Sequence, residues 1–283
     1  MRVRRPAAAG TFYPGDPLIL ARTVDRLLDD AKDAKTDRPW GLVAPHAGYR
    51  YSGPVAATAY AAARPWADRI ARVVVLGPAH FVPLEGCAAP VADAWGTPLG
   101  DVGIDLELRA EAVAAGCVLD DEPHVPEHSL EVQLPFLQRL FGPEVRTLPV
   151  AVGRMAASAA SAVLQAVAGS ADLVVVSTDL SHHLDLVSAR VADRRTADAI
   201  LTGDPAEIGP RDACGVFALR GLMAYASATG RVLELLDLRT SGDTAGDPTR
   251  VVGYGAFTVG EAGRSGIRHR VGSVSGPAPM LRR

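Results

Sequence analysis

The sequence is poor in lysine and in aromatic residues, and each shortage excludes a class of function. Lys32 and Lys35 are the only lysines and lie in none of the motifs below, so Schiff-base chemistry is not expected. Aromatic residues make up 5% of the chain, too few to argue for an aromatic cage. The net charge of −3 argues against a broad phosphate-binding surface, so no nucleic-acid partner is expected.

Cysteine is also scarce. Cys87, Cys117 and Cys214 are isolated, and this odd, sparse set predicts reduced thiols in the cytosol without a disulfide framework. No apolar stretch follows the charged N-terminus, and the Ala/Ser-rich run 156–171 is too weakly apolar to span a bilayer. We therefore expect a cytoplasmic protein with no membrane partner, in which Cys87 and Cys117 are structural.

The hydrophobic fraction of 48% is ample for a large core, and the 283 residues contain no obvious linker. We expect one domain over residues 1–262 and a disordered tail over 263–283, which is rich in Gly, Ser, Pro and Arg. Apolar runs predict strands at 41–44, 72–76, 145–152, 173–177 and 250–259. Amphipathic or Ala-rich stretches predict helices at 16–34, 54–63, 104–115, 127–140, 155–168, 187–201 and 214–228. This alternation is typical of an α/β fold with a mostly parallel sheet and helices on both faces.

Three of the predicted strands end in loops that carry histidine: residues 45–49, 77–80 and 178–183. Ligands bind outside the carboxyl ends of strands in open α/β sheets, so parallel strands would bring these loops to one crevice. Neutral imidazole is the commonest metal ligand, and two histidines with one anionic ligand leave metal positions open. The loops therefore predict a shared, metal-binding site.

The third ligand is left open among Asp179, Glu131 and Cys214. Cys214 lies close to Arg211 at the start of a predicted helix, and both features would lower the pKa of its thiol. A buried structural cysteine is an equally good interpretation. His128 and Glu131 are three residues apart and would share one helix face, while Glu127 could serve the helix dipole.

Several motifs occur in a fixed order: Arg5-Pro-Ala-Ala-Ala-Gly-Thr-Phe-Tyr-Pro14, Pro45-His-Ala-Gly-Tyr49, Tyr51-Ser-Gly-Pro54, Leu76-Gly-Pro-Ala-His80, Glu127-His-Ser-Leu-Glu-Val-Gln-Leu-Pro-Phe136, Ser177-Thr-Asp-Leu-Ser-His182, Cys214-Gly215 and Val252-Gly-Tyr254. Together they resemble the Memo family, called AmmeMemoRadiSam system protein B in bacteria, over residues 5–260. The resemblance implies a three-layer αβα sandwich with a mostly parallel or mixed sheet, similar to that of type III extradiol ring-cleaving dioxygenases. Those enzymes bind Fe(II) with two histidines and a glutamate, and Memo-like proteins place a cysteine at the glutamate position.

Carried over by motif, the resemblance implies His46, His80 and Cys214 as metal ligands. It implies His182 as the acid/base residue, with Asp179 beside it. We place His128, Glu131 and Tyr51 in the substrate pocket. One departure is Phe81, which stands where relatives often carry a second histidine.

The favoured hypothesis is a metal-dependent redox enzyme that uses Fe(II), with Cu or Zn as alternatives. A thiolate on iron is oxidisable, so the resemblance supports the site better than the reaction. The alternatives are a binding protein that keeps the pocket without catalysis, and a Zn hydrolase with Glu131 or His182 as the base. The family name also suggests a functional link to a radical-SAM protein and an AMMECR-like protein. The substrate is an unidentified small molecule.

Overall fold

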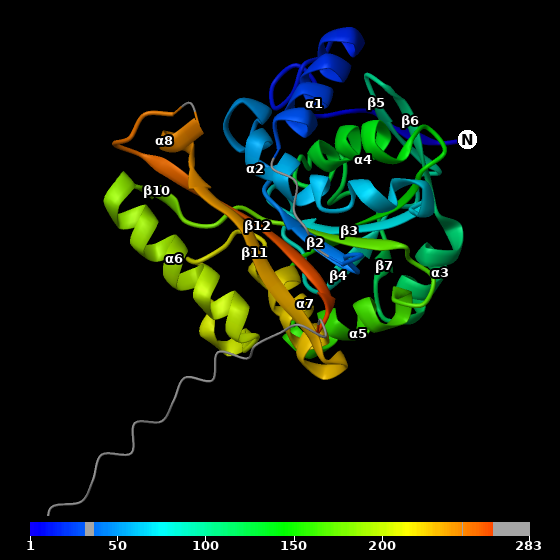
Figure 1. Ribbon diagram of the computed structural model, residues 1–283. Helices are drawn as coiled ribbons and strands as arrows, with labels where there is room; N and C mark the ends of the chain where they lie inside the picture. The colour runs from blue at the N-terminus through cyan, green and yellow to red at the C-terminus, as the bar shows by residue number, and fades with distance from the viewer. Residues whose placement is uncertain (32–36, 245, 263–283) are drawn as a thin grey trace, which may run out of the picture.

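A mixed β-sheet forms the centre of the protein, with helices on both faces (Figure 1). The computed structural model describes residues 1–31, 37–244 and 246–262. The twelve strands run in the order β1-β5-β6-β8-β3-β9-β2-β12-β10, with β11 beside β12 and β4 beside β7 and β8. The three-layer αβα architecture expected from the sequence is confirmed. The tail expected to be disordered, 263–283, lies outside the described residues.

The strands are β1 Val3–Arg4, β2 Gly41–Ala44, β3 Arg72–Pro78, β4 Cys87–Ala89, β5 Ala94–Thr97, β6 Gly100–Ile104, β7 Val118–Leu119, β8 Arg146–Val152, β9 Leu173–Ser177, β10 His182–Leu184, β11 Arg231–Thr240 and β12 Val251–Glu261. The α-helices are α1 Pro17–Asp30, α2 Tyr49–Ala61, α3 Leu106–Ala114, α4 Leu134–Phe141, α5 Ala157–Val167, α6 Leu186–Thr202, α7 Val216–Thr229 and α8 Ser241–Thr244. Short 3₁₀ helices are η1 Arg64–Arg69, η2 Glu131–Gln133 and η3 Pro205–Glu207.

Four parallel strands make the middle of the sheet. β3 pairs with β8 on one side and β9 on the other, and β9 pairs with β2. Their central residues are buried on both faces, which explains the continuous β-branched runs in the sequence. Because all four strands run in the same direction, the loops that follow them emerge at one edge of the sheet.

The antiparallel part of the sheet leaves a weaker signal in the sequence. β12 pairs antiparallel with β2 and, over nearly its whole length, with β11. β11 was not predicted because most of it is exposed or half-buried and it carries the charged residues Glu234, Asp237 and Arg239. A half-exposed strand at a sheet edge does not produce a long apolar run.

The helices form two layers. α1, α2 and α4 pack together on one face of the sheet, while α3, α5 and α7 pack together on the other (Figure 1). α6 packs against β11 and β12. The Asp16 side chain caps α1 by accepting a hydrogen bond from the Ile19 N–H, and Leu20, Val24 and Leu28 bury the inner face of the helix.

The helix predicted over 127–140 is wrong in its first half. Residues 127–130 form an irregular turn, a 3₁₀ turn follows at Glu131–Gln133, and α4 begins at Leu134 with Pro135 in its first turn. His128 and Glu131 therefore do not share a helix face, and their side chains point to different parts of the protein.

The prediction that Cys87 and Cys117 are reduced thiols is contradicted. The two residues form a disulfide with their Cα atoms 4.8 Å apart. Cys87 begins β4 and Cys117 immediately precedes β7, so the pairing of these short strands brings the two sulfur atoms together. The spacing of 30 residues gave no local signal for this contact. Within the described ranges, none of the helices has the length and apolar character needed to cross a membrane.

Candidate metal centre

Three histidines meet at the carboxyl ends of the parallel strands. His46 follows β2, His80 follows β3, and His128 lies in the turn before η2. One ring nitrogen from each lies within 4.8 Å of the others. The centroids of the His80 and His128 rings are 4.8 Å apart, and the His46 ring lies 5.2 Å and 5.5 Å from them. The cluster combines two of the predicted ligands with a residue that we expected in the substrate pocket.

Hydrogen bonds fix the tautomer of His46. Its Nδ1 lies 2.9 Å from the Ser177 hydroxyl, which donates its own proton to the Ser129 carbonyl at 2.6 Å. The Ser177 oxygen must therefore accept from His46 Nδ1–H, and Nε2 keeps a free lone pair. Burial, with the neighbouring His80 and His182 rings, lowers the pKa of His46 to about 3. His46 is thus a neutral imidazole with Nε2 available as a ligand atom.

Glu127 fixes His80 in the same way. The fully buried carboxylate of Glu127 accepts hydrogen bonds from the His80 ring Nδ1 at 2.9 Å and from the His80 backbone N–H at 2.5 Å. Burial alone would raise the pKa of Glu127, but these bonds and one from the Ser129 N–H lower it to about 2. Glu127 is therefore a carboxylate that holds the His80 ring through Nδ1, an arrangement common behind metal-binding histidines.

His128 closes the cluster from a third side. Its Nδ1 is buried and lies 3.3 Å from a Glu127 oxygen, yet it has no hydrogen-bond partner in the described part of the chain. The Phe12 ring lies against the His128 ring with a centroid distance of 4.2 Å and a tilt of 31°. Burial and the nearby His46 lower the pKa of His128 to about 4, so this ring is neutral as well. A buried, neutral, unpartnered imidazole nitrogen is a suitable ligand atom.

Cys214 lies against His46. Its Sγ is 3.2 Å from His46 Nε2 and accepts a hydrogen bond from the Asp179 N–H at 3.3 Å. The expected lowering of the thiol pKa is wrong for the metal-free site: burial, together with the Asp179 carboxylate, raises the pKa of Cys214 to about 12. Desolvation outweighs the hydrogen bonds to the sulfur from the Asp179 and Gly215 backbones and from the Thr178 side chain, which lower the pKa. Without a metal, the thiol can donate its proton to His46.

Asp179 lies on the loop after β9, and His182 begins β10 at the end of that loop. Asp179 is buried, and its carboxylate accepts a hydrogen bond from the His46 backbone N–H at 2.8 Å instead of orienting a histidine ring. Burial raises the pKa of Asp179 above its usual range. His182 is exposed, and its Nδ1 donates to the Leu180 carbonyl at 2.8 Å, which leaves Nε2 free to accept a proton.

Glu131 holds the N-terminal segment instead of lining the cluster. Its fully buried carboxylate accepts hydrogen bonds from Arg4 at 2.6 Å, the Ala7 N–H at 2.7 Å, the Ala8 N–H at 2.8 Å and the Tyr13 hydroxyl at 2.6 Å. These four donors occupy both carboxylate oxygens. Neither a ligand role nor a general-base role is left for Glu131 in this arrangement. Tyr51 lies in the first turn of α2 with 37% of its surface exposed.

The segment 127–133 ties the strand ends together. The Ser129 hydroxyl donates to the carbonyl of Pro78, the last residue of β3, at 2.8 Å. The Gln133 amide donates to the Pro45 carbonyl after β2 at 3.1 Å and to the Ser177 hydroxyl of β9 at 2.8 Å. Sequence reasoning singled out this segment but missed the parts played by Glu127, Ser129 and Gln133.

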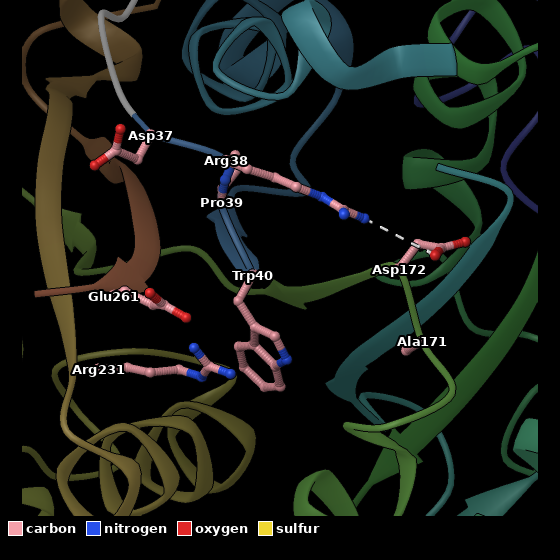
Figure 2. A pocket seen from close by; sticks show the side chains of 8 residues that line it. All are labelled: Asp37, Arg38, Pro39, Trp40, Ala171, Asp172, Arg231 and Glu261. Carbon is pink, nitrogen blue, oxygen red and sulfur yellow. Dashed lines mark ion pairs between the residues drawn. The ribbon is translucent and has the colours of Figure 1, made fainter. Parts of the chain in front are cut away.

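A separate hollow of about 420 Å³ lies at the opposite edge of the sheet (Figure 2). Trp40 precedes β2 and Asp172 precedes β9, so the hollow is at the amino ends of the parallel strands. The Arg38 side chain reaches across it to Asp172 at 3.9 Å, and the guanidinium of Arg231 lies over the Trp40 ring at 5.1 Å. The hollow shares no residue with the histidine cluster.

Comparison with known proteins agrees with this arrangement of motifs. Residues 4–258 match the family model described as Memo-like protein. The chain belongs to the Memo family. A MEMO1 family protein of Methanococcoides burtonii is 39% identical over 91% of this chain and all of its own length. A MEMO1 family protein of Methanopyrus kandleri is 38% identical over 90% of this chain and 98% of its own length. The resemblance inferred from the sequence motifs is therefore confirmed.

Proposed function

We propose that this Memo protein is a metal-dependent redox enzyme whose metal is bound by His46, His80 and Cys214, with His128 at the edge of the same site. Fe(II) is the expected metal, and Cu and Zn are the alternatives. The observation that carries the proposal is the fixed tautomer of two histidines. Ser177 and Glu127 hold the Nδ1 atoms of His46 and His80, so each ring would bind a metal in this cluster through Nε2.

The donor atoms suit such a metal. Imidazole nitrogen binds Fe, Cu and Zn, and thiolate sulfur favours the softer members of this group. The separation of 3.2 Å between Cys214 Sγ and His46 Nε2 is compatible with both atoms binding one ion. Because the Cys214 thiol is protonated in the metal-free site, metal binding through sulfur would release a proton.

A metal held here would supply redox capacity and open positions for a small substrate. The protein's own residues would manage protons and orientation. His182, with Nε2 free, would transfer a proton, a role that typically contributes about 10²–10⁴-fold to a rate. Asp179 would keep the His46 loop in place through the His46 backbone N–H.

The first test is metal content after anaerobic loading with Fe(II) and removal of excess ion. We expect about one metal per wild-type chain, a loss in His80→Ala, and no change in His183→Ala, an exposed histidine outside the cluster. Cobalt loading of wild type, Cys214→Ser and His128→Ala then identifies the third ligand. A thiolate-to-cobalt absorption band that disappears only in Cys214→Ser supports the sulfur ligand. Equal metal content and equal spectra in wild type and Cys214→Ser would remove sulfur from the site.

The second test is turnover. Oxygen consumption by the Fe(II)-loaded protein is measured with a panel of catechols and small phenols, with His182→Gln as the comparison. Turnover that falls at least about 100-fold in His182→Gln supports the proposed role of that residue. Saturable binding of these compounds without oxygen consumption would contradict the enzyme and favour the binding protein.

A further inference from the structure

The segment that carries His182 is held through its backbone, as the short strand β10 beside β12. Residues His182–Asp185 are exposed, so the position of the imidazole depends on where the backbone is anchored. His183 has a left-handed backbone, with φ of 62°, which is uncommon for a residue with a side chain. Such a conformation persists only where its surroundings impose it. The anchors of this segment therefore decide where His182 lies.

One anchor is a buried acid on the following helix. Asp193 on α6 is 1% exposed, and its Oδ1 accepts a hydrogen bond from the Ser181 N–H at 3.0 Å. α6 follows directly after β10, and its cap Asp185 accepts from the N–H groups of Val187 and Ser188. The chain thus turns back on itself, and Asp193 reaches the residue immediately before His182.

The second anchor is Gly253 on β12. Its N–H donates to the Ser181 carbonyl and its carbonyl accepts from the Leu180 N–H, both at 2.8 Å. A Cβ at Gly253 would lie 2.0 Å from Asp193 Oδ2, so the carboxylate packs directly on the glycine backbone. Only glycine leaves room for Asp193 to reach Ser181. The two anchors therefore depend on each other.

We propose that Asp193 is a positioning residue that fixes the Ser181–His182 backbone against Gly253 and so holds the His182 imidazole in place. The His182 Nδ1–H bond to the Leu180 carbonyl, at 2.8 Å, requires this backbone geometry and sets which ring nitrogen is free. The proton-transfer consequence rests on the role of His182 proposed above. The positioning itself does not need a metal or a substrate.

The test uses the metal-free full chain, so that it is independent of metal loading and turnover. Hydrogen exchange of the Ser181 amide and the ¹⁵N signals of the His182 ring are compared in wild type, Asp193→Ala and Asp193→Asn. We expect Ser181 exchange to rise about 10- to 100-fold in Asp193→Ala, because the amide loses a charged acceptor. The His182 ring should then populate both tautomers. Asp193→Asn keeps an acceptor oxygen and should remain within about threefold of wild type in exchange.

Asp198→Asn is the matched control, because Asp198 lies on the same helix with 63% of its side chain exposed. Asp198→Asn should change neither the exchange rate of the Ser181 amide nor the ¹⁵N signals of the His182 ring. Metal content in Asp193→Ala should match wild type, since Asp193 contacts none of the proposed ligands. If metal loading fails in wild type while Asp193→Ala still alters His182, the proposed function fails and the positioning role stands.

Gly253→Ala keeps the proposal testable if Asp193→Ala does not fold. The new methyl group must displace the carboxylate, so Gly253→Ala should raise Ser181 exchange as Asp193→Ala does. In Asp193→Ala/Gly253→Ala the methyl occupies the space left by the carboxylate, so exchange should be no faster than in either single variant. Unchanged Ser181 exchange and an unchanged His182 tautomer in Asp193→Ala or Gly253→Ala would overturn the proposal.

Discussion

Replacing Glu131 with glutamine should destabilise the fold strongly, although the change removes no volume. Arg4 and the Ala7 N–H both donate to Oε2, and the Ala8 N–H and the Tyr13 hydroxyl both donate to Oε1. Whichever way the glutamine amide is turned, its NH₂ group faces two donors. The Arg4 guanidinium, whose side chain is 6% exposed, also loses its counter-charge. Breaking one side of a buried ion pair typically costs about 3–5 kcal/mol, and we expect a loss in this range.

Urea unfolding followed by circular dichroism measures this loss as the free energy of unfolding. Glu122→Gln, an exposed acid in the loop before this segment, is the matched control and should change stability by less than about 0.5 kcal/mol. Arg4→Met combined with Glu131→Gln should cost less than the sum of the single changes, because the charge and its partner are removed together. A loss below about 1 kcal/mol in Glu131→Gln would refute the reasoning.

Three further predictions concern pH, the disulfide and the metal. His46 and His128 have folded-state pKa values of about 3 and about 4, below the ordinary 6.5, so below pH 6.5 the unfolded chain binds more protons. The free energy of unfolding should therefore be highest above pH 6.5 and should fall by up to about 1.4 kcal/mol per pH unit for each histidine between pH 6.5 and about pH 4. A urea midpoint that does not change over this pH range would contradict the prediction. Reducing the Cys87–Cys117 disulfide should cost about 2–4 kcal/mol, read as a lower urea midpoint in reductant, whereas an unchanged midpoint would argue against the bond. Glu127→Gln should weaken metal affinity about 10- to 100-fold in a chelator competition, and unchanged affinity would show that the carboxylate does not orient His80.

The parallel centre of the fold could be predicted because its signal is local. The strands at 41–44 and 173–177 have the expected bounds, since a strand buried on both faces must be apolar at every position. The loops after parallel strands emerge at one edge of the sheet. The amino-acid sequence alone is therefore enough to predict that His46 and His80 lie close together.

Other parts of the site depend on contacts between distant residues. Arg4 pairs with Glu131 across 127 positions, and Cys87 pairs with Cys117 across 30. No periodicity encodes such contacts. The predicted helix over 127–140 also put His128 and Glu131 on one face, because residues three apart in a helix are neighbours. In the structure, helical geometry begins only at Glu131, so His128 lies outside it. The irregular turn could not be inferred from spacing.

The irregular turn matters because it sends neighbouring polar groups in different directions. Glu127 and Glu131 are both fully buried and would lie on one side of a regular helix. In the turn, Glu127 faces His80 and Glu131 faces the N-terminal segment, so two carboxylates can be buried without repelling each other across one face. Arg4 links them, because it donates to the Glu131 carboxylate and to the backbone carbonyl of Glu127 at 2.6 Å. Arg4 therefore neutralises the buried Glu131 carboxylate and also positions the backbone of Glu127, the residue that orients His80. Through Arg4, the stability of the N-terminal segment is coupled to the geometry of the histidine cluster.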